Sequence, residues 1–285
     1  MFQSGSATLE QTLALDDIHE QWDQNYRTPE CLEYLERALD RLVPLLAIQP
    51  GALVLDAGCG AGVNSIRIAN RGFRVEAVDF SDAVLQTARK SVESAGLSEQ
   101  VHLRQENLLA LRFPDESFDA TFCWGVLMHI AEVDQALSEL SRVLKPGGKL
   151  VVSEINMRSL QRICFVTLTR LLRRSRAPET RTPAGMECWF QTSAGPLLRR
   201  HTDIRWLVDA LEARGLRLVA RHPGQFTELY LKARSRRVKA WIQRFNIFWV
   251  RFVRIPHPAF GNILVFEKSG DGMVSPTGFE PVSPA

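Results

Sequence analysis

Three glycines follow an aspartate in the stretch VLDAGCGAG, which gives the pattern Asp56-x-Gly58-x-Gly60-x-Gly62. Glycine has no Cβ, so it serves where a backbone must turn sharply or let a ligand come close. The short apolar run before these glycines is typical of a buried strand. A strand, a glycine turn and a following helix together indicate a site for a nucleotide-like cofactor.

Two common phosphate-binding motifs do not fit this turn. The dinucleotide fingerprint G-x-G-x-x-G requires a third glycine where this chain has Val63. The phosphate loop ends in G-K-[ST], whereas the sequence here is Gly62-Val63-Asn64. The glycines therefore favour a different cofactor, and Val63 disfavours a nicotinamide oxidoreductase.

Apolar runs alternate with segments of helical periodicity between residues 49 and 156, which predicts a doubly wound α/β core. Two further apolar runs downstream extend the same sheet. The expected strands are ALVLDAG, FRVEAVDF, VHLRQEN, FDATFCWG and KLVVSEIN, followed by LRLVARHPG and GNILVFEKSG. In an open sheet of this kind the ligand lies beyond the carboxyl ends of the strands, where the glycine turn also lies.

An ordered series of motifs continues through this core. Phe113-Pro114-Asp115, Ser117-Phe118-Asp119, His129-Ile130 and the run RVLKPGG at 142–148 follow the glycine turn in that order. The series resembles the class I S-adenosylmethionine-dependent methyltransferases, in the subgroup of ubiquinone and menaquinone biosynthesis enzymes (type 11 methyltransferase domain). The resemblance implies S-adenosylmethionine as cofactor. It also implies a Rossmann-like, seven-stranded, mostly parallel sheet whose last strand is antiparallel.

The resemblance assigns a role to each residue of the cofactor site. Asp79, after the second strand, would accept hydrogen bonds from the ribose hydroxyls, and Phe80 would lie against the adenine. Asn107 stands where the family often has an aspartate, so either Asn107 or its neighbour Glu106 would accept from the adenine amino group. The cofactor contacts implied are Asp56, Gly58, Gly60, Gly62, Asp79, Phe80, Asn107, Leu108 and Trp124.

Methyl transfer from a sulfonium is an in-line displacement that needs no metal or covalent intermediate. A hydroxyl acceptor would benefit from a general base, and His129, just past the fourth strand, is the candidate. The alternative for His129 is a structural role at the start of the next helix. Glu154, at the end of the fifth strand, is a candidate carboxylate on the acceptor side. Five scattered cysteines without a Cys/His cluster argue against a zinc site.

The chain divides into five segments by composition and pattern. Additions around the core are expected to cover the acceptor, and residues 157–201 are expected to form a basic helix end followed by an irregular loop. The segments are a helical N-terminal cap (1–48), the cofactor-binding core (49–156), a basic insertion or lid (157–201), the C-terminal part of the fold (202–268) with a helical insertion at about 233–254, and a disordered tail (269–285).

Basic charge is concentrated in one part of the chain. Residues 158–258 contain 21 Lys and Arg against 6 Asp and Glu, although the whole chain has a net charge of only +3. Within 233–254, four aromatic residues recur on one helical face: Trp241, Phe245, Phe248 and Phe252. This helix can pack against the sheet, which we prefer, or lie on an anionic membrane.

The sequence therefore predicts a cytoplasmic S-adenosylmethionine-dependent methyltransferase, with peripheral contact at the inner membrane surface as a further expectation. The acceptor would be a small molecule, a lipid precursor or a glycan, with O-methylation slightly preferred. The alternatives are a nucleic-acid methyltransferase, disfavoured because Cys123-Trp124-Gly125-Val126 replaces the N/D-P-P-[YF] motif, and a non-catalytic membrane-associated protein that retains the fold. The sequence leaves the identity of the acceptor and the oligomeric state open.

Overall fold

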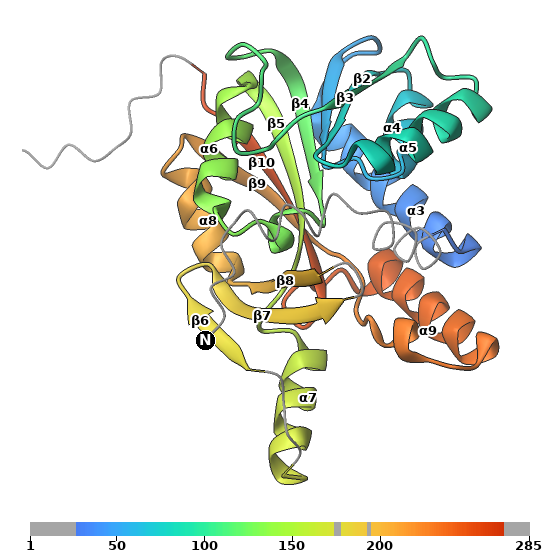
Figure 1. Cartoon of the computed structure of the whole chain (residues 1–285), viewed down its shortest axis with the longest axis vertical. Coiled ribbons are helices and arrows are strands. Elements are labelled where there is room, and N and C mark those ends of the chain that lie inside the picture. The colour runs from blue at the N-terminus through green and yellow to red at the C-terminus, as the bar shows by residue number, and fades with distance from the viewer. Residues whose placement is uncertain (1–26, 174–177, 193–194, 271–285) are drawn as a thin grey trace, which may run out of the picture.

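The centre of the molecule is a seven-stranded sheet with the strand order β3-β2-β1-β4-β5-β10-β9 (Figure 1). The computed structural model describes residues 27–173, 178–192 and 195–270. Strands β1 to β5 are parallel, and β10 is antiparallel to both β5 and β9. The predicted Rossmann-like sheet with an antiparallel last strand is confirmed. The strands are β1 (Leu53–Ala57), β2 (Arg74–Asp79), β3 (Val101–Gln105), β4 (Phe118–Trp124), β5 (Leu144–Ile155), β9 (Leu216–Pro223) and β10 (Gly261–Lys268).

Helices cover both faces of the sheet, which explains why its strands are apolar without alternation. In β1, Val54 packs into the core on one face, while Leu55 packs into the core on the other. The first face is covered by α3 (Pro29–Leu46), α4 (Val63–Ala69) and α5 (Asp82–Ser94). The second face is covered by α6 (Val133–Arg142) and α8 (Ile204–Glu212).

The insertion after β5 differs from the prediction. It begins with α7 (Leu160–Leu171), as the helical pattern suggested. The prediction of an irregular loop after this helix is wrong. That part of the chain forms a three-stranded antiparallel sheet of β6 (Glu179–Thr182), β7 (Gly185–Thr192) and β8 (Gly195–Thr202). Gly185 permits the close pairing, because a Cβ at this position would lie 2.1 Å from the His201 carbonyl oxygen.

The second insertion lies between β9 and β10. It contains the short turn η2 (Leu229–Lys232) and then α9 (Arg236–Phe248), which continues into the π-helical turn η3 (Trp249–Val253). Another short turn, η1 (Leu127–His129), follows β4. The helix predicted at about 233–254 is thus present, but it packs against α3 rather than against the sheet. No helix within the described ranges is long and apolar enough to cross a membrane. Residues 1–26 of the predicted N-terminal cap and residues 271–285 of the predicted tail lie outside the described residues.

Candidate functional site

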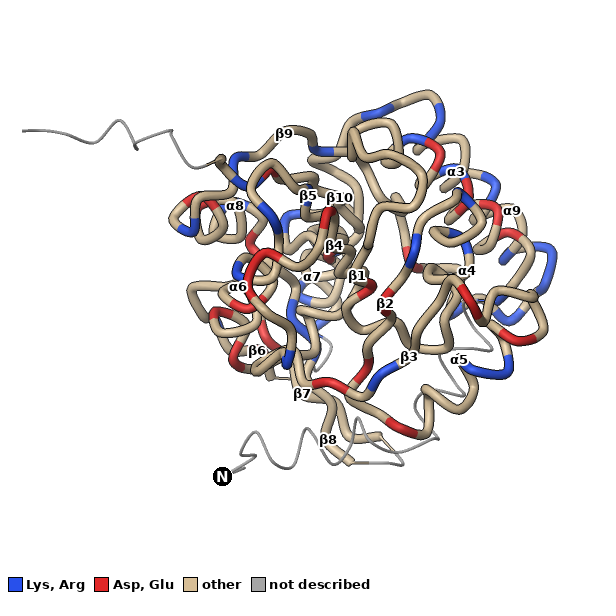
Figure 2. The backbone as a smooth tube through the Cα atoms, turned by 90° about the horizontal axis from the view of Figure 1, so that it is seen from above, with Lys and Arg blue, Asp and Glu red and all other residues tan. Residues whose placement is uncertain are grey.

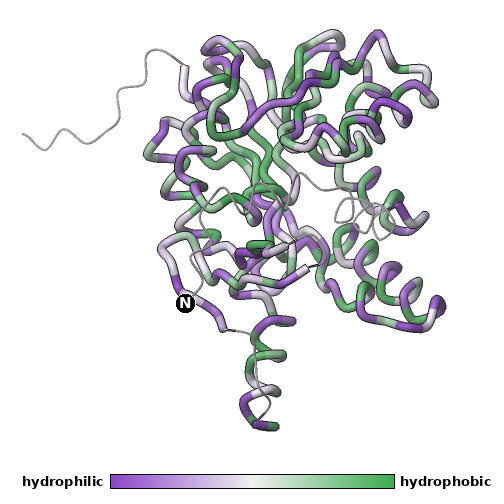
Figure 3. Tube along the Cα trace, in the orientation of Figure 1, coloured by the Kyte–Doolittle hydropathy of each residue, from purple (hydrophilic) through white to green (hydrophobic). Residues whose placement is uncertain are grey.

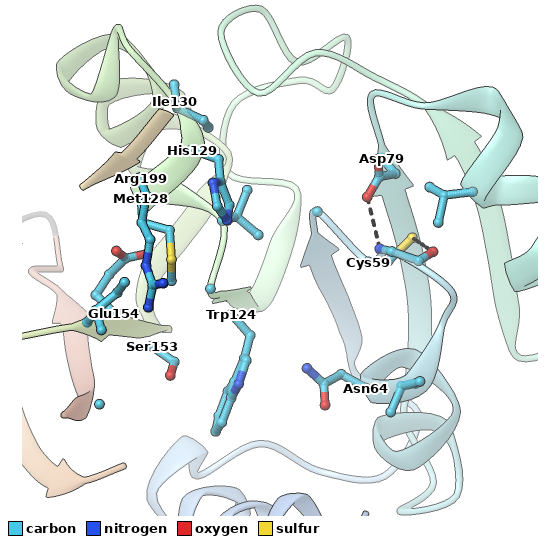
Figure 4. A pocket seen from close by; sticks show the side chains of 18 of the residues that line it. Cys59, Asn64, Asp79, Trp124, Met128, His129, Ile130, Ser153, Glu154 and Arg199 are labelled. Carbon is cyan, nitrogen blue, oxygen red and sulfur yellow. Dashed lines mark hydrogen bonds between the residues drawn. The ribbon is translucent and has the colours of Figure 1, made fainter. Parts of the chain in front are cut away.

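A cavity of about 610 Å³ opens at the carboxyl ends of β1, β2, β4 and β5 (Figure 4). This is where an open α/β sheet binds its ligand. The cavity gathers all the predicted site residues except Asp56 and Gly62. Those on its wall are Gly58, Gly60, Asp79, Phe80, Asn107, Leu108, Trp124 and His129.

The glycines of the turn after β1 are required for two different reasons, close packing at Gly58 and open space for a ligand at Gly60. Gly58 has a φ of +78°, and a Cβ there would lie 2.4 Å from the Val126 side chain, so only glycine fits. Gly60 has a φ of +53°, but a Cβ there would meet no atom within 4 Å. At Gly60 the open space belongs to the cavity. The backbone of the turn is therefore presented directly to a ligand, which is the arrangement that a bound cofactor requires.

Asp56 supports this turn from behind and does not reach the cavity. Its side chain is fully buried and its Oδ2 accepts a hydrogen bond from Ser65 Oγ at 2.6 Å. Burial raises the pKa of Asp56 to about 6, because desolvation penalises its charged form. Gly62, the residue before α4, also lies away from the cavity wall. Asp56 and Gly62, both predicted to contact the cofactor, therefore lie behind the glycine turn and not on the cavity wall.

Asp79 connects the second strand to the glycine turn. Its Oδ2 accepts a hydrogen bond from the Gly60 amide at 2.9 Å, and its Oδ1 accepts one from the Ser81 amide at 3.1 Å. Ser81 in turn caps α5, since its Oγ accepts from the Val84 amide. One carboxylate at the end of β2 therefore fixes both the cofactor turn and the start of the next helix. Figure 4 shows Asp79 across the cavity from His129.

The segment after β3 shows which of Asn107 and Glu106 can contact an adenine ring in the cavity. Glu106 is buried and pairs with Arg112 and Arg104, away from the cavity, so it cannot replace Asn107 at an adenine ring. Asn107 lines the cavity, but its Oδ1 already accepts a hydrogen bond from the Leu109 amide at 2.9 Å. A carbonyl oxygen has a second lone pair, so Asn107 can still accept from a ligand.

His129 is held in one orientation by a strand that the sequence did not reveal. Its Nδ1 lies 2.7 Å from the Leu198 carbonyl oxygen, which can only accept a hydrogen bond. In the neutral ring Nδ1 therefore carries the proton, and Nε2 is the proton-accepting nitrogen. Leu198 belongs to β8, so the insertion after β5 sets the tautomer of the predicted base.

Arg200 fastens the same strand to the turn that carries His129. Its guanidinium donates to the carbonyl oxygens of Leu127 and Ile130 at 2.9 Å each, and it pairs with Glu187 at 2.8 Å. The Arg200 side chain is completely buried. Sequence reasoning missed this residue, because an arginine on an amphipathic strand is ordinarily exposed.

Glu154 lies on the wall of the cavity at the end of β5, near Met128 and Arg199 (Figure 4). Its Oε2 accepts a hydrogen bond from Thr202 Oγ1 at 3.1 Å, whereas its buried Oε1 has no hydrogen-bond partner among the described residues. Burial raises the pKa of Glu154 to about 7. The group can therefore be a neutral carboxylic acid near neutral pH.

The raised pKa of Glu154 should make the free energy of unfolding depend on pH. Because the folded-state pKa of Glu154 exceeds its ordinary value of 4.5, its stabilising effect is complete below pH 4.5 and is lost as the pH rises through about 7. We expect Glu154→Gln to remove this dependence, so that wild type loses about 3 kcal/mol relative to the variant between pH 4.5 and pH 8.

Urea unfolding of both proteins across that pH range measures the difference. Asp56 also has a raised pKa, but it titrates in both proteins and its effect cancels. A difference in unfolding free energy that stays constant with pH would contradict the assignment.

The other end of the cavity is mostly apolar. Arg199 and Glu228 form an ion pair there, and neither of the other two histidines of this region, His201 or His222, reaches the cavity wall. Burial lowers the pKa of His201 to about 3, so it stays neutral. The apolar residues of this end are Met128, Ile155, Phe190, Leu197, Leu231 and Phe260. A partly apolar acceptor fits such a wall.

The sheet order, the glycine turn and the acidic residue after β2 define a class I methyltransferase fold. Comparison with known proteins agrees. Residues 55–152 match the sequence model of the family described as "Methyltransferase domain". That segment is therefore similar to a methyltransferase domain, and the S-adenosylmethionine-dependent class with this fold uses S-adenosylmethionine as its cofactor.

Individual relatives support the same assignment. Methyltransferase GfsG from Streptomyces halstedii is 32% identical over 145 residues, which cover 50% of this chain and 52% of that protein. Demethylmenaquinone methyltransferase from Clavibacter sepedonicus is 34% identical over 143 residues, covering 50% and 56%. The chain thus spans about half the length of the curated relatives it matches. The solved structure of PH0226 protein from Pyrococcus horikoshii has a TM-score of 0.60 at 17% identity, covering 90% of this chain and 100% of that one, and shows the shared fold.

Proposed function

We propose that this protein binds S-adenosylmethionine at the glycine turn and transfers its methyl group to a small-molecule, lipid-precursor or glycan acceptor. The observation that carries the proposal is that one continuous cavity joins Gly60 and Asp79 on one side to His129 and Glu154 on the other. The bound cofactor would supply a methyl group on a positively charged sulfur. The chain's own task is then to hold and align the reactants.

The residues of the cavity fit this task. The backbone around Gly60 would approach the methionyl part, Asp79 would accept from the ribose hydroxyls, and Phe80 and Leu108 would border the adenine. Trp124, at the end of β4, would stand between the cofactor and the acceptor end. Holding the reacting groups in line can supply roughly 7–11 kcal/mol of the barrier in favourable cases.

We further propose that the acceptor is a hydroxyl and that His129 takes its proton. The hydrogen bond of Nδ1 to the Leu198 carbonyl leaves Nε2 as the basic nitrogen of the neutral ring. The apolar wall of the acceptor end would exclude water, which strengthens the interaction between the base and the hydroxyl. These features support O-methylation over transfer to nitrogen or carbon.

A substitution separates this role of His129 from a structural one. In His129→Asn, the side-chain amide can keep the hydrogen bond to the Leu198 carbonyl, but the base is gone. We expect kcat to fall about a hundredfold or more, with unchanged binding of S-adenosylmethionine and loss of the acidic limb of the pH–rate profile. A variant with normal kcat and a normal pH profile would show that His129 is only structural.

The acceptor itself is found by incubating the protein with a cell extract and methyl-labelled S-adenosylmethionine. We expect a labelled small molecule or lipid that forms only with active protein. Labelled RNA or DNA instead would favour the nucleic-acid alternative, to which the basic segment 158–258 points. Cofactor binding without any labelled product would favour the non-catalytic alternative.

A further inference from the structure

The burial pattern of α9 is the reverse of that of an ordinary surface helix, because its polar side faces the protein and aromatic residues face solvent. Its buried residues are the polar pair Gln243 and Asn246, while Trp241 is 70% exposed and Phe248 is 48% exposed. In the continuing turn η3, Phe252 is 60% exposed. A soluble helix normally buries its apolar stripe, so this outward face calls for a partner.

Specific hydrogen bonds hold the polar side of α9 inward. Gln243 Nε2 donates to the sulfur of Cys31 in α3 at 3.1 Å. Asn246 Oδ1 accepts from the Thr227 amide at 3.1 Å, and its Nδ2 donates to the Thr227 carbonyl oxygen at 3.0 Å. Rotating α9 to bury its aromatic residues would leave these buried polar groups unpaired, at a cost of about 1–3 kcal/mol for each. The outward orientation is therefore built into the fold.

Four aromatic residues form a continuous row along this side of the helix, three of them exposed and Phe245 half-buried against Phe226. Trp241 stacks on Phe245 at 6.4 Å between ring centroids, Phe245 contacts Phe248 at 6.4 Å, and Phe248 contacts Phe252 at 5.2 Å. We call these four residues the aromatic ridge. Because the rings support one another, the ridge is already ordered before any partner arrives, which lowers the entropic cost of binding.

A second apolar helix lies at the same end of the molecule. Figure 1 shows α7 projecting from the body at the bottom of the view, and α9 at the lower right, below α3. Within α7, all of whose residues are described, Thr169 is the one buried residue, and Leu171 is 75% exposed. Figure 3 shows apolar stretches along this projection. Its other exposed apolar side chains are Leu160, Ile163, Phe165 and Leu168.

Contacts tie the root of α7 to the segment that leads into α9. Gln161 Oε1 accepts from Thr227 Oγ1 at 2.6 Å and from the Glu228 amide at 2.7 Å. Farther along α7, the Lys232 ammonium lies 5.5 Å from the centre of the Phe165 ring. The two helices thus meet through one connecting segment, which also contributes Glu228 and Leu231 to the cavity wall.

The charged residues within the two segments that carry α7 and α9 have a single sign. Residues 229–258 contain eight Lys and Arg and no Asp or Glu, and residues 158–173 contain four arginines and no acidic residue. Figure 2 shows basic positions along α9. Arg236, Arg237 and Arg244 are exposed beside the aromatic ridge. A surface that is both apolar and strongly basic matches the interface of an anionic bilayer, where acyl chains and negative headgroups lie together.

We propose that α7 and the aromatic ridge form a docking surface for an anionic phospholipid membrane. The ridge and the apolar side of α7 enter the boundary between headgroups and acyl chains, and the arginines contact the headgroups. A second copy of this chain is a poorer occupant, because two identical basic faces would repel each other. The inference rests on the exposed surface alone and does not depend on methyl transfer.

Sedimentation of the protein with vesicles tests this proposal. We expect binding to vesicles of equal parts phosphatidylcholine and phosphatidylglycerol, little binding to pure phosphatidylcholine, and release by high salt. Arg236→Gln with Arg237→Gln, and separately Phe252→Glu, should each weaken binding roughly tenfold or more, since a basic residue near the surface contributes about 1 kcal/mol. All these residues are exposed, so the variants should keep the circular dichroism spectrum of wild type.

Matched variants lie outside the two helices. Arg89→Gln with Lys90→Gln on α5 removes the same charge, and Val219→Glu on β9 places the same acid at another exposed apolar position. Both should bind vesicles like wild type. The proposal is overturned if wild type ignores anionic vesicles at low salt, or if the ridge variants bind as well as their controls. A dimer in analytical ultracentrifugation that Phe252→Glu dissolves would also overturn it, by assigning the ridge to a second copy.

Discussion

Replacing Asp79 by alanine is expected to weaken the binding of S-adenosylmethionine by about a hundredfold or more, as measured by equilibrium dialysis of the labelled cofactor. The substitution removes the proposed acceptor of the ribose hydroxyls, and a hydrogen bond to a charged group contributes about 1.5–3 kcal/mol. It also removes the bond from the Gly60 amide, so the turn itself loses a support.

The matched control is Asp82→Ala. Asp82 lies three residues along the chain, in the first turn of α5, and is exposed, so this change removes the same charge without touching the cavity. Cofactor binding by Asp82→Ala should equal that of wild type. Equal binding by Asp79→Ala and wild type would show that the ribose lies elsewhere.

The second large effect is expected on stability, at Arg200. Its guanidinium is buried and satisfies Glu187 together with the carbonyl oxygens of Leu127 and Ile130. Arg200→Met removes the guanidinium from all three groups. The remaining donors, Thr182 Oγ1 to Glu187 and the Ile130 amide to the Leu127 carbonyl, do not replace its positive charge. We expect a loss of about 3–5 kcal/mol in the free energy of unfolding, the usual effect of breaking a buried ion pair by removing one partner.

Arg217→Met provides the comparison. Arg217 pairs with Glu267 at 2.7 Å, but its side chain is 67% exposed, so its loss should change the unfolding free energy by no more than about 1 kcal/mol. Urea denaturation of both variants measures the difference. Similar losses at the two positions would mean that the buried guanidinium does not fasten β8 to the turn of His129.

The core and the cofactor side were predictable because their residues carry local signals. Runs such as the one containing Val54 and Leu55 are buried on both faces of the sheet, and this gives an uninterrupted apolar strand that sequence reasoning recognises. The glycine turn is recognisable for a similar reason. At Gly58 the backbone angle and the nearby Val126 leave no room for another residue, so spacing alone marks the turn.

The insertion after β5 could not be predicted in the same way. Its strands are only half buried and carry charged residues, so their pattern is weak. The buried Arg200 depends on partners from other segments, namely Glu187 on the paired strand β7 and the carbonyl groups of Leu127 and Ile130. These two carbonyl groups lie 70 or more residues away in the sequence. Such a partner set arises from tertiary structure, and no short segment contains it.

The outward face of α9 has the same origin. Four aromatic residues on one side of a helix ordinarily predict a buried stripe, and we preferred that interpretation. The polar side is inward instead, because Cys31 and Thr227 supply partners for Gln243 and Asn246. Cys31 is 212 residues distant in the chain, so the sequence around α9 alone could not reveal the inversion.

The central claim is that the cavity at the ends of β1 and β2 holds S-adenosylmethionine. Isothermal titration of the folded wild-type protein tests it most directly. The account predicts saturable, one-to-one binding of S-adenosylmethionine and none of a nicotinamide dinucleotide, since Val63 replaces the third glycine of the dinucleotide turn. Absence of binding by folded protein, or equal binding of the dinucleotide, would contradict it.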